Sequence, residues 1–429
     1  MIIMTSGASN ISGTFDVLVI GGGPAGMMAA GRAAEQGANV ALVEKNRRPG
    51  TKLLMTGGGR CNLTNTSIRP ESLVEHFGKP GRFLYPSVRM FGVPELAEFF
   101  GARGLTLNTE PGGRVFPETD RAKDVLRALL EYMREGGVKL VTGHAVTGFE
   151  KEANTITAAR TPAGLMRANS FILCTGGRSY PATGSTGEGY GFLERLGHAV
   201  VPPAPALTPI KVKEDWVRRV EGAGIADAVV SACSSGKKCA SARGGVIFTG
   251  DGLSGPAALD MSASVGILMQ SADVTLTLDL LPETAPDRMD AELVSLFDAH
   301  PNMLAKNIVE RLVPPKLAPT LVTLAGLDPE MRLNKIPRKG RLSLGRLLKG
   351  LPLTVTGLHG FRRAMVTSGG VSLGEVDPKT MRSKLVDNLF IAGELLDITG
   401  PTGGYNLQVC WSTGYAAGDA VGRATIIAS

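Results

Sequence analysis

Cysteine and aromatic residues are scarce in this chain of 429 residues. It has five cysteines, and only 5% of its side chains are aromatic. The cysteines are odd in number and scattered, at Cys61, Cys174, Cys233, Cys239 and Cys410. This excludes a disulfide framework and favours a reducing compartment. Cys233 and Cys239 lack accompanying histidines or a second cysteine pair, so no metal site is predicted.

Long hydrophobic runs are also missing. No uninterrupted apolar run approaches the length needed to cross a membrane, so no membrane partner is expected. Residues 1–13 lack the basic start and apolar centre of a signal peptide and are interpreted as a loose tail. The five histidines fall into no catalytic triad or metal-ligand spacing. We therefore expect a cytoplasmic protein.

Charge of one sign is not concentrated along the chain. The net charge is +7, but the basic residues are mixed with acids over the whole length. The nearest approach to a basic stripe is the segment 332–349, which a solvated helical face explains equally well. A nucleic-acid partner is therefore unlikely on composition alone. Apolar residues make up 43% of the chain, enough for two or three domains with a sizeable core.

The first chemical signal is a strand that runs into a glycine turn. The apolar residues 15–20 precede the spacing Gly-x-Gly-x-x-Gly, which is typical of a dinucleotide-binding turn. Gly21 allows the sharp turn, Gly23 lets a pyrophosphate approach the backbone, and Gly26 lets the next helix pack closely. A helix over 25–36 and a strand over 38–44 should follow, and Glu44 lies where a carboxylate accepts from ribose hydroxyls. A βαβ unit with an ordinary turn is the alternative.

The C-terminal region decides which dinucleotide is predicted. Residues 388–394 read as a strand ending in Gly393 and Glu394, and the turn 402–406 opens a helix predicted over 407–420. In flavoproteins of the glutathione-reductase type, a C-terminal strand and helix return to the FAD-binding domain in this way. The N-terminus of that helix is directed at the flavin ring. We therefore predict noncovalently bound FAD. The acceptor for ribityl or pyrophosphate-side hydroxyls would be Glu394.

A second nucleotide domain is not predicted. No further Gly-x-Gly-x-x-Gly follows a strand, and the segment 184–189 has the wrong spacing. NAD(P)H would therefore bind only transiently over the flavin. The paired cysteines of flavin disulfide reductases are missing as well, since Cys61 stands alone after the first nucleotide unit.

Composition shifts divide the rest of the chain. Prolines from residue 202 mark a linker, a small barrel or sandwich should extend to about residue 281, and proline-broken helices fill 282–349. We predict an α/β protein with a discontinuous Rossmann-like FAD-binding domain, an inserted β-barrel and a helical subdomain. The predicted divisions are the first part of the FAD domain at 1–200, the barrel at 201–283, the helical insert at 284–349, a return through the barrel at 350–358, and the rest of the FAD domain at 359–429.

Several motifs together resemble the bacterial YhiN/BaiN-type flavoproteins, a family of NAD(P)/FAD-dependent oxidoreductases that includes an aminoacetone oxidase. They lie at 57–65, 113–117, 248–256, 380–384, 393–397 and 403–408. The resemblance spans nearly the whole chain after the tail and implies the three-part architecture. Asp251 departs from the family pattern. Candidate FAD contacts are Gly21, Gly23, Pro24, Ala25, Gly26, Glu44, Lys45, Lys52, Gly59, Arg60, Cys61, Asn62, Val146, Thr175, Gly176, Gly177, Gly393, Glu394, Gly403, Gly404, Tyr405 and Asn406.

The candidate catalytic residues are Arg60, Cys61, His359 and Arg363. Flavin chemistry places the hydride step on the cofactor, so the protein mainly orients substrate and stabilises charge. Arg60 can neutralise a pyrophosphate or a substrate carboxylate through two hydrogen bonds. The alternative is a purely structural role within its loop. Cys61 is redox-active or a packing residue, and without a partner cysteine packing is favoured. His359 and Arg363 would be a proton donor and an anion clamp, or a barrel-edge pair.

The leading hypothesis is an FAD-dependent oxidoreductase that transfers a hydride between a small organic substrate and flavin. Its second partner would be NAD(P)H or oxygen. An alternative is an FAD-containing RNA-binding protein in the manner of tRNA-modifying enzymes, using the segment 332–349. A redox-silent FAD protein is a third possibility. Substrate and oligomeric state do not follow from the sequence.

Overall fold

The computed structural model describes residues 14–428, so the predicted tail over 1–13 lies outside them. Chain contacts divide the molecule into two compact units. The discontinuous unit comprises Met1–Pro205 and Met365–Ser429, and the inserted unit comprises Ala206–Ala364. The chain therefore crosses from one unit to the other twice.

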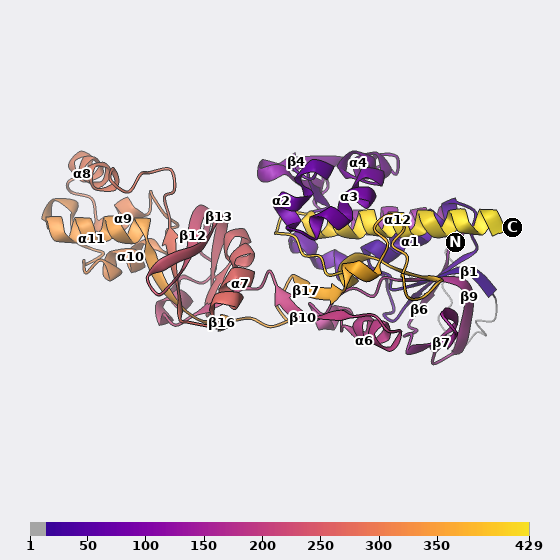
Figure 1. The fold of residues 1–429 in the computed structure, drawn as a ribbon. Helices are drawn as coiled ribbons and strands as arrows, with labels where there is room; N and C mark the ends of the chain where they lie inside the picture. The colour runs from indigo at the N-terminus through magenta and orange to yellow at the C-terminus, as the bar shows by residue number, and fades with distance from the viewer. Residues whose placement is uncertain (1–13, 429) are drawn as a thin grey trace. The chain divides into compact units, whose positions relative to one another are not determined.

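The discontinuous unit is built on a sheet in the order β6-β2-β1-β9-β8-β7, with β18 pairing with β9 (Figure 1). Strands β6, β2, β1, β9 and β18 are parallel, whereas β7, β8 and β9 form an antiparallel meander. The strand bounds are β1 Thr14–Ile20, β2 Val40–Glu44, β6 Lys139–Thr142, β7 Gly148–Glu152, β8 Thr155–Thr161, β9 Gly164–Leu173 and β18 Leu389–Ile391. β9 continues unbroken from its hairpin with β8 to its parallel pairing with β1 in the core.

Helix α1 (Pro24–Glu35) packs against the long C-terminal helix α12 (Tyr405–Ala428), drawn yellow in Figure 1. The two backbones approach closely because a Cβ on Gly414 or Gly418 would collide with α1 carbonyl oxygens. Buried Asp419 on α12 accepts from Arg32 Nε on α1 at 3.0 Å. The helix predicted over 407–420 thus begins two residues earlier and ends later, since α1 supplies a partner along its length.

The remaining elements of this unit are a second, small sheet and five helices, α2 to α6. A small sheet has the order β3-β5-β4. The bounds are β3 Thr64–Asn65, β4 Leu107–Glu110, β5 Arg114–Pro117, α2 Leu73–Phe77, α3 Gly81–Met90, α4 Val93–Gly101, α5 Ala122–Glu135 and α6 Glu188–Arg195. Helix α5 is strongly amphipathic and buries Val125, Leu129 and Met133. That spacing of four residues places them on one face of the helix, as an amphipathic sequence pattern predicts.

The inserted unit contains a closed barrel in the order β11-β14-β13-β12-β15-β16, so the predicted inserted barrel is confirmed. Its strands are β11 Ile210–Val212, β12 Gly224–Ser234, β13 Lys237–Thr249, β14 Gly252–Ser254, β15 Val274–Asp279 and β16 Leu351–Leu358. Four helices lie between β15 and β16 in sequence: α8 Met289–Ala299, α9 Ala305–Val309, α10 Ala318–Leu324 and α11 Arg338–Lys349. Sequence reasoning missed α7 (Pro256–Leu268), whose apolar composition reads equally well as a buried strand.

Two paired strands flank both crossings between the units. β10 (Val200–Ala206) and β17 (Val366–Val371) form a two-stranded sheet. Residues 367–371 are rich in glycine and nevertheless lie in β17. Gly369 and Gly370 have positive φ there because the Pro202 and Leu395 carbonyl oxygens approach their Cα atoms.

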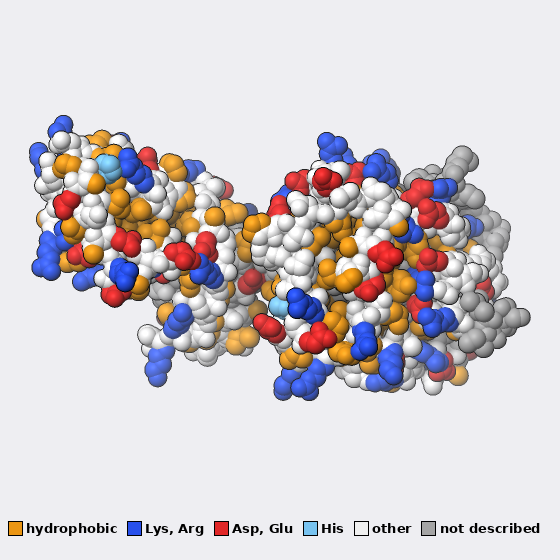
Figure 2. All heavy atoms as spheres, turned by 90° about the horizontal axis from the view of Figure 1, so that it is seen from above, with side chains coloured by type: hydrophobic (Ala, Val, Ile, Leu, Met, Phe, Trp, Pro, Cys, Tyr) orange, Lys and Arg blue, Asp and Glu red, His pale blue; other side chains and the backbone are white. Residues whose placement is uncertain are grey.

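Surface charge is mixed on the face drawn in Figure 2, where Lys and Arg lie among Asp and Glu. Within residues 14–428, no helix is long and apolar enough to cross a membrane. Both observations agree with the composition of the sequence.

Candidate functional site

A cavity opens at the carboxyl ends of β1, β2 and β9, where parallel α/β sheets bind their ligands. It encloses about 900 Å³, including its open side. Predicted residues on its wall are Gly21, Gly23, Pro24, Ala25, Glu44, Lys45, Lys52, Val146, Thr175, Gly176 and Glu394. All of its lining residues belong to the discontinuous unit.

The glycine turn between β1 and α1 has the shape that the motif predicts. Gly21 has φ +106°, and a Cβ there would collide with the Cys174 carbonyl. A Cβ on Gly26 would collide with the Gly21 oxygen. Gly23 differs, because a Cβ there meets no described atom within 4 Å and the residue lines the cavity. Gly21 and Gly26 are therefore required by the fold itself, and Gly23 leaves open space at the start of α1.

Glu44 lies at the end of β2, and its carboxylate closes the turn. Oε2 accepts from the Gly22 N–H at 2.7 Å, and Oε1 accepts from the Asn46 N–H at 2.7 Å. Burial raises the pKa of Glu44, while these two backbone hydrogen bonds lower it. Each oxygen keeps a lone pair for a hydroxyl donor.

Beside the glycine turn, the cavity wall comes from the segment after β9. The Thr175 hydroxyl is buried and has no hydrogen-bond partner among the described residues. Such an atom costs about 1–3 kcal/mol unless a ligand or water satisfies it. Residues 183–188 also line this wall, and they overlap the segment 184–189 whose spacing does not fit a nicotinamide motif. Lys45 Nζ contacts Glu188 at 2.9 Å there.

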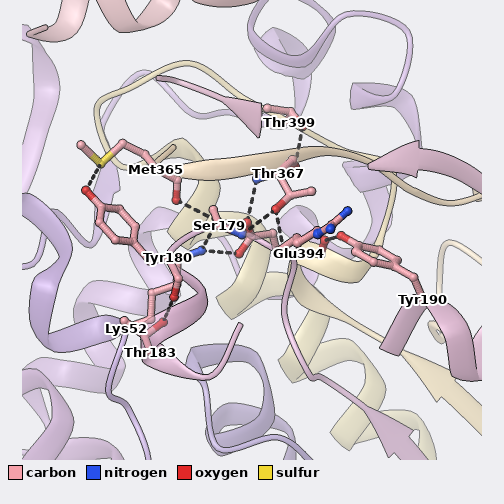
Figure 3. A network of polar contacts seen from close by, with 10 residues as sticks. Lys52, Ser179, Tyr180, Thr183, Tyr190, Met365, Thr367, Glu394 and Thr399 are labelled. Atoms are coloured by element: carbon pink, nitrogen blue, oxygen red, sulfur yellow. Dashed lines mark hydrogen bonds and ion pairs between the residues drawn. The ribbon is translucent and has the colours of Figure 1, made fainter. Parts of the chain in front are cut away.

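Glu394 is the centre of a polar network at one side of the cavity (Figure 3). Its Oε2 lies 2.8 Å from the ammonium of Lys52. Its Oε1 accepts from the Ser179 hydroxyl at 3.0 Å and from the Thr367 N–H at 2.8 Å. Tyr190 donates to the Glu394 carbonyl at 3.2 Å. The predicted hydroxyl acceptor is thus already held by three donors, and Oε2 retains an open lone pair.

Gly177 does not line the cavity, although the sequence suggested that its bare backbone faces a phosphate. A Cβ at this position would collide with the Thr367 hydroxyl and crowd the Glu394 carboxylate. The glycine therefore makes room for the network behind the cavity wall. Gly393, with φ +76°, likewise packs against Ala25.

The loop carrying Arg60, Cys61 and Asn62 lies outside the lining of this cavity. Arg60 pairs with Glu110 and with Asp120 and stacks over the Phe116 ring, so its charge is already neutralised. Burial raises the pKa of the Cys61 thiol to about 12, which keeps it protonated and favours the packing role.

The same loop has a positive φ at four of five consecutive residues, with Arg60 the exception at φ −89°. Gly57, Gly58, Gly59 and Cys61 all have positive φ. Asn62 Oδ1 is buried without a partner among residues 14–428. An orphaned acceptor on a strained loop is typical of a ligand-contacting segment.

The C-terminal turn packs on the strand that follows this loop. Gly403 and Gly404 have φ of +111° and +104°, and a Cβ on Gly404 would collide with the Thr64 oxygen. The contacts of Asn406 lie within the turn, and its predicted contact with FAD stays a prediction. Its side chain bonds Gly400 N–H and carbonyl at 2.9 Å each and holds the turn. The Tyr405 hydroxyl lies 2.7 Å from Ser67 Oγ.

His359 and Arg363 belong to the inserted unit. His359 Nε2 lies 3.1 Å from Asp251 Oδ2, and Arg363 Nη1 lies 3.9 Å from Asp251 Oδ1. His359 and Arg363 are thus the ionic partners of Asp251, the residue that departs from the family pattern. Their proposed acid and anion-binding roles stay predictions.

Comparisons with known proteins assign the chain to a protein family. A sequence profile described as the HI0933-like protein Rossmann domain matches residues 15–420. The 3-dehydro-bile acid delta(4,6)-reductase of Clostridium scindens is 33% identical over 405 residues, covering 94% of this chain and 98% of that protein. The chain belongs to the HI0933-like family. The ribosomal RNA dihydrouridine synthase of Escherichia coli is 29% identical, covering 94% of this chain and 96% of its own.

Solved structures show the same fold at low identity. The 3-ketosteroid-delta4-(5alpha)-dehydrogenase of Rhodococcus jostii has a TM-score of 0.54 at 15% identity, covering 95% of this chain and 97% of its own. The HI0933-like protein is an FAD-dependent oxidoreductase, as the family and its reductase member indicate. Its residues fit that cofactor: the space at Gly23, the free lone pairs of Glu44 and the orphaned Thr175 hydroxyl all point to a bound dinucleotide.

Sequence reasoning missed Ser179 and Thr367, which hold Glu394, and the wall from 183 to 188. Neither Ser179 nor Thr367 stands in a recognisable motif, because each lies near Glu394 only through the fold. The polar tract at 183–188 was visible as glycine-rich sequence. Its spacing does not fit a nicotinamide motif, so only the fold places it in the site.

Proposed function

We propose that this HI0933-like protein is an FAD-dependent reductase of carbon–carbon double bonds conjugated with a carbonyl group. The observation that carries the proposal is what its full-length relatives share. A delta(4,6) double-bond pair beside a 3-oxo group, and the 5,6 double bond of uracil beside its C4 carbonyl, are both conjugated enones. One chemistry therefore serves two otherwise unrelated substrates.

The chain's own residues divide the work of holding the cofactor. The Gly23 turn and the N-terminus of α1 would bind the pyrophosphate, and Glu44 would bind adenosine ribose hydroxyls. Thr175 and Glu394 would bind the connecting chain, with Lys52 fixing the carboxylate of Glu394. Bound FAD supplies reversible hydride transfer.

Electrons would come from NAD(P)H binding transiently, since residues 14–428 contain one glycine turn of the dinucleotide type. The substrate gains a hydride at its β-carbon and a proton at its α-carbon, so the product is two hydrogens heavier. Molecular oxygen would act only as a competing acceptor of the same electrons.

The test is product analysis under nitrogen. Holoenzyme, NADH or NADPH and one enone at a time are incubated, using a 3-oxo-delta4 steroid, a 3-oxo-delta4,6 steroid and uridine-containing RNA. We expect at least one product heavier by two hydrogens, with deuterium from labelled nicotinamide at the β-carbon. A saturated ketone without the conjugated bond is the control. Turnover of the control but of no enone would overturn the proposal.

RNA as the substrate is a second candidate, supported by the exposure of the segment 332–349. Arg341 pairs with Asp290 at 2.8 Å and Lys349 with Asp279 at 2.7 Å. The other cations of this segment are exposed, namely Arg332, Lys335, Arg338, Lys339 and Arg346. They form no ion pair among the described residues. These five charges can contact phosphates, as the segment's composition suggested.

Neutralising Arg338, Lys339 and Arg346 of α11 with glutamine is expected to weaken RNA binding and flatten its salt dependence. Each lost phosphate contact lowers the slope of log K against log salt by about 0.7–0.9. Filter binding across a salt series measures this slope. The matched control neutralises Lys123, Arg127 and Arg134 on α5. Equal slopes for both triple variants would remove α11 from the RNA-binding surface.

A further inference from the structure

The strand β17 carries the chain back from the inserted unit and at once contacts Glu394, a residue of the FAD cavity wall. The inserted unit ends at Ala364, and Thr367 stands three residues later. Thr367 is 1% exposed, and no sequence motif marks it. Its surroundings distinguish it from an ordinary strand residue.

Every polar atom of Thr367 has a partner, and each partner belongs to the discontinuous unit (Figure 3). Its N–H donates to Glu394 Oε1 at 2.8 Å. Its hydroxyl oxygen accepts from the N–H of Arg178 at 2.7 Å and from the N–H of Ser179 at 3.2 Å. Its carbonyl accepts from Thr399 at 3.2 Å. One residue thereby connects three separate chain segments.

The contacts of Thr367 determine where the carboxylate of Glu394 can lie. Oε1 is held from one side by the Thr367 N–H and from another by the Ser179 hydroxyl, which Thr367 orients through the backbone of Ser179. Oε2 is left facing Lys52 and the cavity. The bare Cα of Gly177 completes the arrangement, because any side chain there would displace the Thr367 hydroxyl.

We infer that Thr367 is a positioning residue of the FAD site, which fixes Glu394 for the cofactor. By linkage, FAD bound against Glu394 stabilises β17 where it is. The inference rests on the FAD site and not on the identity of the substrate. It adds a strand to the site that neither the glycine motif nor the C-terminal turn indicates.

Thr367→Val is the direct test, because valine keeps the shape and removes the hydroxyl acceptor. We expect the Kd for FAD to rise about tenfold, as loss of one buried hydrogen-bond acceptor predicts. Thr367→Ser should restore it. Thr208→Val is the matched control: Thr208 is a fully buried threonine of the inserted unit whose hydroxyl donates to a backbone carbonyl at 2.8 Å. It should lose stability without losing FAD affinity.

Hydrogen exchange gives a second readout that a merely structural threonine would not change. The Thr367 amide should exchange more slowly when FAD is added, and Gly177→Ala should reduce both this protection and FAD affinity. If Thr367→Val and Gly177→Ala bind FAD with the wild-type Kd, or if FAD leaves exchange in β17 unchanged, the inference is wrong. Neither measurement depends on enone reduction, so either outcome leaves the proposed function to its own test.

Discussion

Gly23→Ala is expected to remove most FAD binding while leaving the free protein as stable as wild type. Gly23 has φ −82° and ψ −177°, which alanine adopts readily, and a Cβ there meets no described atom within 4 Å. The added methyl group would occupy space that the pyrophosphate needs. We expect the Kd for FAD to rise at least tenfold, about 1.4 kcal/mol.

Fluorescence titration with FAD measures this Kd, and scanning calorimetry of the FAD-free protein checks stability. Gly101→Ala is the matched control. Gly101 ends α4, also has open space around its Cα, and does not line the cavity. Wild-type FAD affinity in Gly23→Ala would show that the pyrophosphate does not lie at this turn.

Glu394→Ala is expected to damage both the fold and the site. Removal of the carboxylate leaves the Lys52 ammonium, the Ser179 hydroxyl and the Thr367 N–H without their shared acceptor. The Lys52 and Glu394 side chains are only 21% and 17% exposed, so solvent replaces little of this interaction. We expect the free energy of unfolding to fall by about 3 kcal/mol. FAD affinity should fall in parallel.

A double-mutant cycle separates the charge pair from the rest of the network. Lys52→Met combined with Glu394→Ala should recover part of the stability lost in Glu394→Ala alone, because no unpaired ammonium remains. Urea denaturation of the FAD-free variants supplies the four free energies. A Glu394→Ala protein that unfolds at the wild-type urea concentration would contradict the role assigned to this network.

The parts of the fold that local sequence dictates were predictable. The strand-turn-helix around Gly21 and Gly26 follows from steric requirements within a few residues, and the return strand near Glu394 follows from its apolar run. The inserted barrel was visible as a change in composition. Cys174 and Cys410 could be placed in no site from sequence, yet both line the cavity.

The rest depended on contacts between distant segments. Arg60 looked available for a phosphate because nothing in its own loop is acidic, but Glu110 and Asp120 lie 50 and 60 residues away and pair with it. The sequence indicated a phosphate contact at Gly177, because a glycine pair directly after a strand commonly lets a phosphate approach the backbone. Only the fold brings Thr367 against it, 190 residues later in the chain.

The central claim is that the protein's FAD delivers a hydride to a conjugated double bond. The most direct test is a single turnover without oxygen, in which the flavin absorbance is bleached with dithionite or NADPH and an enone is then added. We expect the oxidised flavin band to return at a rate set by enone concentration, with one saturated product per flavin. A flavin that cannot be bleached, or one that stays bleached with every enone and recovers only in air, would contradict it.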